Sequence, residues 1–404
     1  MRKQSEVSYI RKRKRKAGFV YFAYVVLRIF PVKKNKIVFT AFEGDGGFCC
    51  NPRYIAEALL QKKEKFELIW LVNNMNRQFP EGIHKVKNTF WRRAYHLATA
   101  KVWVDNSRKA YGTAKRKKQM YIQTWHAALE FKAVGKFRGK KFPEIARLVS
   151  EYDSKLADYV LSNSKWCTEL YPEMLLYDGE IWKTGSPRCD VLITRREEKY
   201  RQIRVRYGIP AEAKIVMFAP TFRGGGQKGK RQVYVDVPTL NFELLTSALR
   251  EKFGGDWYIM LRLHPQLAAQ LDGLPLHHKA EHMIDVSQAD DMNEVLAATD
   301  VFITDYSSSA FDALNMYIPV FLYADDLQEY TAERGELMWD MYKLPFSIAE
   351  TNEQLRQNIL QFAEETYQKA ARCFLNEHEV VEDGRASVRV ADKIGKFIET
   401  SVNT

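Results

Sequence analysis

The stretch from Asp300 to Asp312 reads DVFITDYSSSAFD, and it indicates the fold more clearly than any other part of the chain. Its apolar run Val301–Thr304 predicts a buried β-strand, and the serines at 307, 308 and 309 follow directly and are expected to begin a helix. A strand that leads into the start of a helix is the repeating unit of a parallel α/β sheet. The unpaired N–H groups at such a helix start favour anions, and the serine hydroxyls add donors. An ordinary serine N-cap is the alternative, but it accounts for only one of the serines.

The same alternation of strands and helices extends over the rest of the chain. Expected strands are Ile37–Phe42, Leu68–Val72, Val102–Asp105, Tyr121–Thr124 and Tyr159–Ser162 in the first half, and Ile215–Phe218, Tyr258–Leu263, Met283–Val286, Val301–Thr304 and Val320–Tyr323 in the second. We expect a helix after the first strand, with Asn51 as its N-cap and Pro52 in its first turn.

These patterns predict an α/β protein with two doubly wound domains, whose ligands bind at the carboxyl ends of the strands. The charged stretch Arg195–Tyr207 separates the two series of strands. The expected division is a basic amphipathic segment at 1–32, a first domain at 33–195, a second domain at 196–385 and a C-terminal helix at 386–404.

The positive charge of this 404-residue chain is local, although the net charge is +12. Residues 1–16 carry +7 and residues 101–147 carry +10, so the remainder is about −5. An anionic partner is therefore expected to meet these two basic patches. The five cysteines include no C-x-x-C pair, which favours a reduced, cytosolic chain without a zinc or redox site.

The N-terminal segment predicts a helix in the membrane interface. Its longest apolar stretch, Ala17–Leu27, is well short of the roughly 20 residues that cross a bilayer. Tyr21, Tyr24 and Arg28 share one helical stripe, apolar residues cover the rest, and the basic run Arg11–Lys16 precedes them. Such a helix lies in an anionic interface with its basic run at the head groups. Alternatively, the helix packs on the protein's own body behind a solvated charge run.

Unusual residues follow several expected strands. His126 follows Tyr121–Thr124 and is a candidate general base, because an unperturbed pKa of about 6.5 allows it to accept a proton near neutral pH. The alternative is a histidine that only stabilises a turn. In the glycine-rich stretch 219–226, Arg223 offers a forked donor to phosphate oxygens, although the stretch is not a P-loop. A mobile surface loop explains that stretch equally well.

Two further clusters suggest ligand contacts in the second half. Alternation along the strand places Arg262 and His264 on one face, which indicates phosphate recognition or else a solvent-facing pair. Glu294, near Asp290-Asp291, either reaches a ribose diol or completes a capping pattern.

The sequence gives little support for a metal or for nucleic acid. The spacing of His277, His278 and His282 makes a poor zinc-ligand face, and no dense carboxylate cluster suggests an intrinsic metal, so we expect no metal or cofactor. The basic stretches lack interleaved aromatic residues and any recognisable RNA-binding module, which argues against a nucleic-acid partner.

In this order, the clusters resemble the CDP-glycerol glycerophosphotransferase family of teichoic-acid biosynthesis. The matching stretches extend from about residue 36 to 390 and are Cys50–Ile55, Gln123–His126, Ser162–Ser164, Gly185–Asp190, Ala219–Arg223, Arg262–Pro265, Thr304–Ser308 and Asp383–Ser387. The resemblance implies a GT-B-like fold of two facing Rossmann-like domains, together with a membrane-associated front segment.

The resemblance also implies roles for individual residues. It makes His126 the catalytic base and places His264 at the transferring phosphate. Arg223, Ser307 and Ser308 would bind the diphosphate, and Asp305 would orient that loop. One departure is that the family commonly has Gly after the first histidine, where this chain has Ala127, so the acceptor or the alditol is open to change.

The implied reaction moves an alditol phosphate from a CDP-alditol to a hydroxyl of a lipid-linked anionic polymer and releases CMP. It would take place at the cytoplasmic face of the cell membrane, with the protein bound peripherally to the inner leaflet. The sequence leaves open glycerol or ribitol, one unit or many, and teichoic acid or capsule. The alternative of another class is a GT-B glycosyltransferase that uses a nucleotide sugar.

Overall fold

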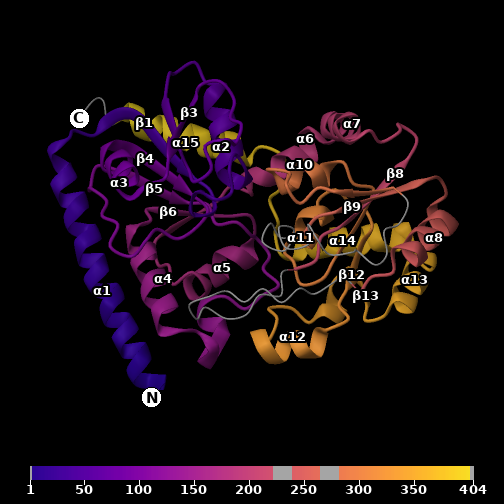
Figure 1. Ribbon diagram of the computed structural model, residues 1–404. Helices are drawn as coiled ribbons and strands as arrows, with labels where there is room; N and C mark the ends of the chain where they lie inside the picture. The colour runs from indigo at the N-terminus through magenta and orange to yellow at the C-terminus, as the bar shows by residue number, and fades with distance from the viewer. Residues whose placement is uncertain (1, 222–238, 264–281, 401–404) are drawn as a thin grey trace. The chain divides into compact units, whose positions relative to one another are not determined.

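The computed structural model describes residues 2–221, 239–263 and 282–400, which form two compact units (Figure 1). Unit 1 comprises the described residues of 1–128, 134–190 and 379–404, and unit 2 comprises those of 129–133 and 191–378. Each unit is built around one parallel sheet, so the predicted α/β class with two parallel sheets is confirmed.

The sheet of unit 1 has the strand order β3-β2-β1-β4-β5-β6-β7, and the paired strands are all parallel. The bounds are β1 Lys33–Thr40, β2 Glu67–Val72, β3 Ile83–Lys87, β4 Ala100–Asp105, β5 Met120–Gln123, β6 Tyr159–Ser162 and β7 Glu180–Lys183. The five strands expected in the first half of the chain are confirmed. The edge strands β3 and β7 were not expected, because most of their side chains are not buried and their sequences show no apolar run.

The helices of unit 1 are α1 Arg2–Val26, α2 Cys50–Leu60, α3 Phe90–Thr99, α4 Glu144–Leu156, α5 Lys165–Met174 and α15 Ala386–Thr400, with the short α6, Asp190–Thr194, at its border with unit 2. The expected N-cap of α2 is wrong. Cys49 occupies that position and makes no side-chain capping bond. Asn51 is instead the second residue of α2, and its side-chain amide donates to the carbonyls of Thr124 and Trp125 in the loop after β5.

The last helix belongs to unit 1, although it ends the chain. Val390, Ile394 and Ile398 on α15 share a buried cluster with Ile55 and Leu59 on α2, and Figure 1 shows the yellow α15 among the purple elements of unit 1. The observed divisions after residues 190 and 378 therefore differ from the expected 195 and 385. A single sequence cannot indicate that a helix returns to a distant sheet.

One face of α1 packs on unit 1 and another is exposed. Ala17, Val20, Ala23 and Tyr24 are buried, and Val20 and Tyr24 share a cluster with strands β1, β2, β4 and β5. Of the stripe Tyr21, Tyr24 and Arg28, Tyr24 is therefore part of the buried face, because the residue is only 2% exposed. Among the described helices, none is both long enough and apolar enough to cross a membrane.

The sheet of unit 2 has the parallel order β10-β9-β8-β11-β12-β13. Its strands are β8 Lys214–Phe218, β9 Trp257–Leu261, β10 Met283–Asp285, β11 Val301–Thr304, β12 Val320–Tyr323 and β13 Ser347–Ala349. Its helices are α7 Arg196–Tyr207, α8 Phe242–Phe253, α10 Met292–Ala297, α11 Ser309–Leu314, α12 Leu327–Arg334, α13 Asn352–Leu360 and α14 Glu364–Glu377. The expected strands of the second half are confirmed, and β13 at the sheet edge was missed.

In both sheets the strand order reverses beside the first strand of the unit. The reversal lies between β1 and β4 in unit 1 and between β8 and β11 in unit 2. In open α/β sheets ligands bind beyond the carboxyl ends of the strands at such a point. The loops after β1, β4 and β5, and those after β8 and β11, are therefore the places to look for a site.

Candidate functional site

In unit 1 the loop with His126 begins beside the ends of two neighbouring strands. Thr40 on β1 pairs with Asp105 on β4, and Asp105 pairs with Gln123 on β5. The chain continues from Gln123 through Thr124 and Trp125 to His126. These pairings bring the loops after β1, β4 and β5 to one edge of the sheet.

The imidazole of His126 is exposed, and contacts from two loops fix its orientation. Its Nδ1 lies 2.9 Å from the carbonyl oxygen of Asn106, the residue after β4. The ring meets the Phe42 ring edge to face at 5.5 Å, and the Phe42 N–H donates to Asn106 Oδ1 at 2.7 Å. Because a carbonyl oxygen only accepts hydrogen bonds, Nδ1 carries the proton and the neutral ring has its lone pair on Nε2. This tautomer presents Nε2 as a base.

A strained turn carries His126. Trp125 has φ of +51°, a conformation that costs a bulky residue on the order of 1–3 kcal/mol. Its N–H donates to Gln123 Oε1 at 2.9 Å, and its carbonyl accepts from the buried Asn51 Nδ2 at 2.9 Å. The Asn51 amide also donates to the Thr124 carbonyl at 3.1 Å and accepts from the Arg188 N–H. These bonds hold both sides of the Trp125 peptide.

The alanine that follows His126 causes no comparable strain. Ala127 is not among the residues with positive φ, so a side chain is tolerated where the resembled family commonly has glycine. The substitution alone therefore gives no physical reason to expect a different acceptor.

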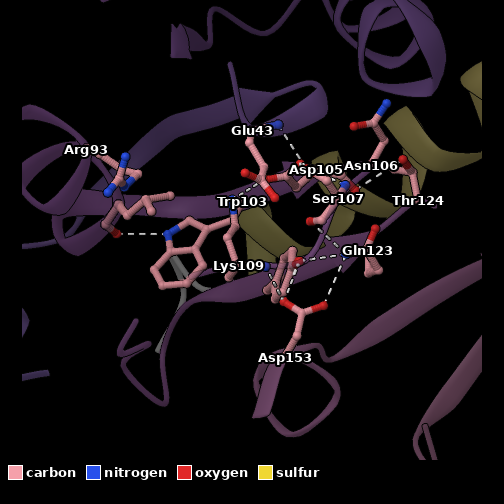
Figure 2. A network of polar contacts seen from close by, with 12 residues as sticks. Glu43, Arg93, Trp103, Asp105, Asn106, Ser107, Lys109, Gln123, Thr124 and Asp153 are labelled. Carbon is pink, nitrogen blue, oxygen red and sulfur yellow. Dashed lines mark hydrogen bonds and ion pairs between the residues drawn. The ribbon is translucent and has the colours of Figure 1, made fainter. Parts of the chain in front are cut away.

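Buried polar groups lie behind this turn (Figure 2). Gln123 Nε2 donates to Asp153 Oδ2 at 3.2 Å and to the Ser107 carbonyl at 3.0 Å, and Figure 2 shows the amide between these two residues. Asp153 Oδ1 accepts from the Lys109 N–H at 2.8 Å and from the Tyr121 hydroxyl at 3.0 Å. Burial raises the pKa of Asp153 to about 6, partly opposed by these donors and by the charge of Arg108.

In unit 2, Asp305 ties the loop after β11 to the loop after β8. Both of its carboxylate oxygens accept from the Thr221 N–H at 2.9 Å, and Oδ1 accepts from the Tyr306 N–H at 2.5 Å. The Thr304 hydroxyl donates to the Ala219 carbonyl at 2.7 Å. The carboxylate therefore holds the start of the serine run against the end of β8.

The serines do not form the capping pattern expected of them. Ser308 occupies the N-cap position of α11 without a side-chain capping bond, and its hydroxyl donates to Glu130 Oε2 at 3.2 Å. The hydroxyls of Ser307 and Ser309 lie 2.8 Å apart, and Ser307 Oγ accepts weakly from the Ser309 N–H at 3.4 Å. The serine side chains therefore bond to one another and to Glu130, and the N-cap residue Ser308 makes no side-chain capping bond.

Glu130 belongs to a short segment, residues 129–133, that leaves unit 1 and packs within unit 2. Its carbonyl accepts from the Trp339 indole N–H at 3.0 Å, and the next ring, that of Phe131, stacks on Phe311 at 4.9 Å. Residues 129–133 thus supply the acceptor for the Ser308 hydroxyl within unit 2.

Two other predicted site residues have structural partners. The Arg262 guanidinium donates to the Val286 carbonyl at 2.8 Å, which connects β9 with the end of β10. Glu294 forms a 2.8 Å ion pair with Lys199, and these side chains are 13% and 9% exposed. Asp291, rather than Glu294, caps α10 through the N–H groups of Asn293 and Glu294.

Arg223 and His264 lie outside the described residues, as do His277 and His278. The described residues therefore bring Asp305, Ser307 and Ser308 together in unit 2 and place His126 in unit 1. In the parts of the chain that the structure describes, no group of three or more His, Cys, Asp or Glu side chains is arranged to hold a metal ion.

The sequence alone does not place Asn51, Asn106, Gln123 and Asp153 in the site. Asn106 and Gln123 did carry a signal, because both are polar residues at the ends of apolar strands. The sequence pattern predicts Asn51 as a helix cap, and Asp153 looks like an ordinary acidic residue within a helix.

The family model for CDP-glycerol:poly(glycerophosphate) glycerophosphotransferase matches residues 22–396. The chain belongs to this family. The resemblance seen in the sequence is thereby confirmed.

Individual members of the glycerophosphotransferase family support the assignment. A teichoic acid poly(glycerol phosphate) polymerase of Staphylococcus epidermidis is 31% identical over 91% of this chain and 51% of its own length. A teichoic acid poly(ribitol-phosphate) polymerase of Bacillus spizizenii is 28% identical over 95% of this chain and 60% of its own length. The chain thus spans about half the length of the first curated relatives that it matches.

A solved structure extends the similarity to the whole fold. The wall teichoic acid polymerase TagF is 27% identical to this chain, with a TM-score of 0.79 over 100% of this chain and 98% of the solved one. The fold of the present chain is GT-B-like, as the resemblance implied.

Proposed function

We propose that the protein transfers an alditol phosphate, most simply glycerol phosphate, from a CDP-alditol to a hydroxyl of a lipid-linked acceptor and releases CMP. The observation that carries this proposal is the 2.9 Å contact between His126 Nδ1 and the Asn106 carbonyl oxygen, in a chain that matches the glycerophosphotransferase family over residues 22–396. A base with its lone pair on Nε2 is the group that an attacking hydroxyl requires.

In the proposed reaction, Nε2 of His126 takes the proton of the acceptor hydroxyl. The oxygen forms a bond to the phosphorus that bears the alditol, and the bond from that phosphorus to the CMP oxygen breaks. Such a transfer depends mainly on in-line positioning and on stabilisation of charge on the phosphoryl oxygens. His126 becomes an imidazolium, and CMP leaves with the electron pair.

The charge on the diphosphate would be met by Arg223, His264, Ser307 and Ser308, with Asp305 holding the serine loop in place. Direct contacts of Arg262 with phosphate and of Glu294 with ribose remain predictions. Arg262 already bonds to the Val286 carbonyl, and Glu294 pairs with Lys199. Binding of the CDP-alditol would have to preserve or replace these two interactions.

Ribitol phosphate is the second candidate, because a ribitol-phosphate polymerase is among the relatives. The test is to incubate the purified protein and a synthetic lipid-linked glycerol phosphate acceptor with radiolabelled CDP-glycerol, CDP-ribitol or UDP-sugars. We expect label in the lipid product from a CDP-alditol, and loss of that product with His126→Ala. Transfer from a UDP-sugar and none from either CDP-alditol would show that the reaction class is wrong.

We also propose that α1 docks the protein peripherally on the anionic inner leaflet. Phe19, Phe22 and Val26 on α1, and Ile29 in the turn just after it, recur at helical spacing and are 44% to 77% exposed. The basic run Arg11–Lys16 precedes them on α1. An exposed apolar stripe next to Lys and Arg is typical of interfacial helices.

Vesicle sedimentation tests this docking. Binding to vesicles with anionic lipid is expected to exceed binding to neutral vesicles and to fall with salt, because the basic run contributes about 1 kcal/mol per charge near the surface. Phe19→Ser with Phe22→Ser should weaken binding at least tenfold. The matched control is Val205→Ser, which changes an 84% exposed apolar residue on α7 and should leave binding unchanged. Equal binding by all variants would contradict the proposal.

A further inference from the structure

The Gln123 amide, 3% exposed, is fixed at both ends beneath the turn that carries His126. Its oxygen accepts from the Trp125 N–H at 2.9 Å. Its nitrogen donates to Asp153 Oδ2 at 3.2 Å, to the Ser107 carbonyl at 3.0 Å and to the Tyr121 hydroxyl oxygen at 2.9 Å. The orientation of the amide therefore decides whether Trp125 has an acceptor.

Asp153 sets that orientation. Its carboxylate is 3% exposed and also accepts from the Lys109 N–H and the Tyr121 hydroxyl, so it presents only acceptor oxygens to Gln123. Figure 2 shows Asp153, from α4, pointing at Gln123 at the end of β5. An amide beside such a carboxylate must turn its NH2 group toward it, which turns its oxygen toward Trp125.

A small cavity lies beside this network and is lined by Arg108, Gln123, Trp125 and Asp153 among other residues. Trp125 has φ of +51°, and such a conformation persists only when the surroundings hold it. The hydrogen bonds from Gln123 and Asn51 to the Trp125 backbone supply part of that constraint.

We propose that Asp153 and Gln123 are positioning residues for His126. The carboxylate orients the Gln123 amide, the amide holds the Trp125 N–H, and the fixed turn keeps His126 Nδ1 at the Asn106 carbonyl. This inference rests on the proposed function, because a fixed imidazole affects the reaction only if His126 is the base.

Asp153→Asn tests the orientation. The oxygen of the new amide is needed by the Lys109 N–H and the Tyr121 hydroxyl, so its NH2 group faces the NH2 group of Gln123. Rotation of Gln123 relieves that clash but turns NH2 toward the Trp125 N–H. With CDP-glycerol and the lipid-linked acceptor, we expect kcat to fall at least tenfold while the KM for CDP-glycerol stays within twofold. Unchanged kcat overturns the inference.

The double variant Asp153→Asn with Gln123→Glu exchanges the carboxylate and the amide. One oxygen of the new carboxylate accepts from the new amide, and the other accepts from the Trp125 N–H. The new glutamate also places an oxygen where the Gln123 NH2 group donates to the Ser107 carbonyl, and the repulsion between these two oxygens limits the recovery. We therefore expect the kcat of the double variant to be at least threefold above that of either Asp153→Asn or Gln123→Glu alone. A merely structural role predicts a double variant worse than both, and that result overturns the inference.

Gln123→Met is the second single variant, in case Asp153→Asn does not fold. It removes the amide and leaves Asp153 its bonds to Lys109 and Tyr121, and the same tenfold loss of kcat is expected, with unchanged kcat overturning the inference. The matched control is Asp158→Asn, which changes another carboxylate that accepts from β5, through the Tyr121 N–H at 2.7 Å, but does not contact Gln123. Its kcat should stay within twofold, and an equal loss there would overturn the inference.

His126→Ala separates the two proposals. If His126→Ala retains full activity, the proposed function is wrong in its base. If His126→Ala is inactive and Asp153→Asn is fully active, the proposed function stands and the positioning role is refuted.

Discussion

Replacing Asp153 with asparagine is expected to remove a defined part of the pH dependence of stability. Burial raises the pKa of this carboxyl from its ordinary value of 3.8 to about 6. The charged groups that act on it are Arg108 and, when ionised, Tyr121, while the Asp105–Lys109 ion pair lies close by. Between pH 3.8 and about 6, the folded protein therefore holds a proton here that the unfolded chain has already released, and above about 6 the group is a carboxylate in both states.

The sign and size of the Asp153 contribution to the free energy of unfolding follow from the difference between its folded and unfolded pKa. The stabilisation from this group is fully present below 3.8 and is lost as the pH rises through about 6, because the ionised carboxylate is the form that burial disfavours. The whole difference amounts to about 3 kcal/mol, of which about 1.4 kcal/mol falls between about pH 5 and about pH 7.5. An asparagine does not titrate, so the variant should lack that share.

Hydrogen exchange measured by mass spectrometry suits this test, because it reads unit 1 separately from unit 2. Peptides that span β5 and α4 give local free energies of opening in wild type and variant at about pH 5 and about pH 7.5, after correction for intrinsic exchange. Other titrating groups, such as Glu382 with its pKa raised by burial to about 8, cancel in the comparison. Equal pH dependence in the two proteins would refute the assigned ionisation of Asp153.

Two further substitutions test separate parts of the account. Gly112→Ala should loosen α1, because a Cβ there would lie 2.3 Å from the Ala17 carbonyl oxygen at φ +99°; we expect trypsin to cut within α1 at least tenfold faster, whereas Gly18→Ala, with open space around it, should not. Equal cleavage of the two variants would contradict the packing of α1. Glu130→Gln keeps an oxygen for the Ser308 hydroxyl and removes a negative charge beside the proposed diphosphate site, so initial rates should show a lower KM for CDP-glycerol with kcat within twofold. A raised KM would place the diphosphate elsewhere.

The sequence predicted the fold best where strands are buried on both faces. Val301–Thr304 and Val320–Tyr323 form strands with the predicted bounds, because a run of apolar residues in a parallel sheet has few alternatives. β13 was missed because only Ala349 in it is buried. The assignment of α15 to unit 1 depends on contacts with α2, which are more than 300 residues away in sequence.

For the site, the ends of strands could be predicted, and the side chains that support them could not. His126 and Asp305 stand out because each follows an apolar run. Asn51 and Asp153 are polar residues in helices, and their hydrogen bonds to the loop after β5 appear only once the helices are packed on the sheet. The expectation that the serines cap α11 was reasonable from composition, but it did not anticipate that Glu130 would accept from Ser308.

The central claim is that the fixed imidazole of His126 presents Nε2 as a base. Its most direct test is the nitrogen NMR spectrum of protein labelled in the imidazole rings of its eight histidines, with His126→Ala to assign the signal. Above the pKa of the ring, the account predicts a protonated Nδ1 and an unprotonated Nε2. A proton on Nε2 with none on Nδ1 would contradict it.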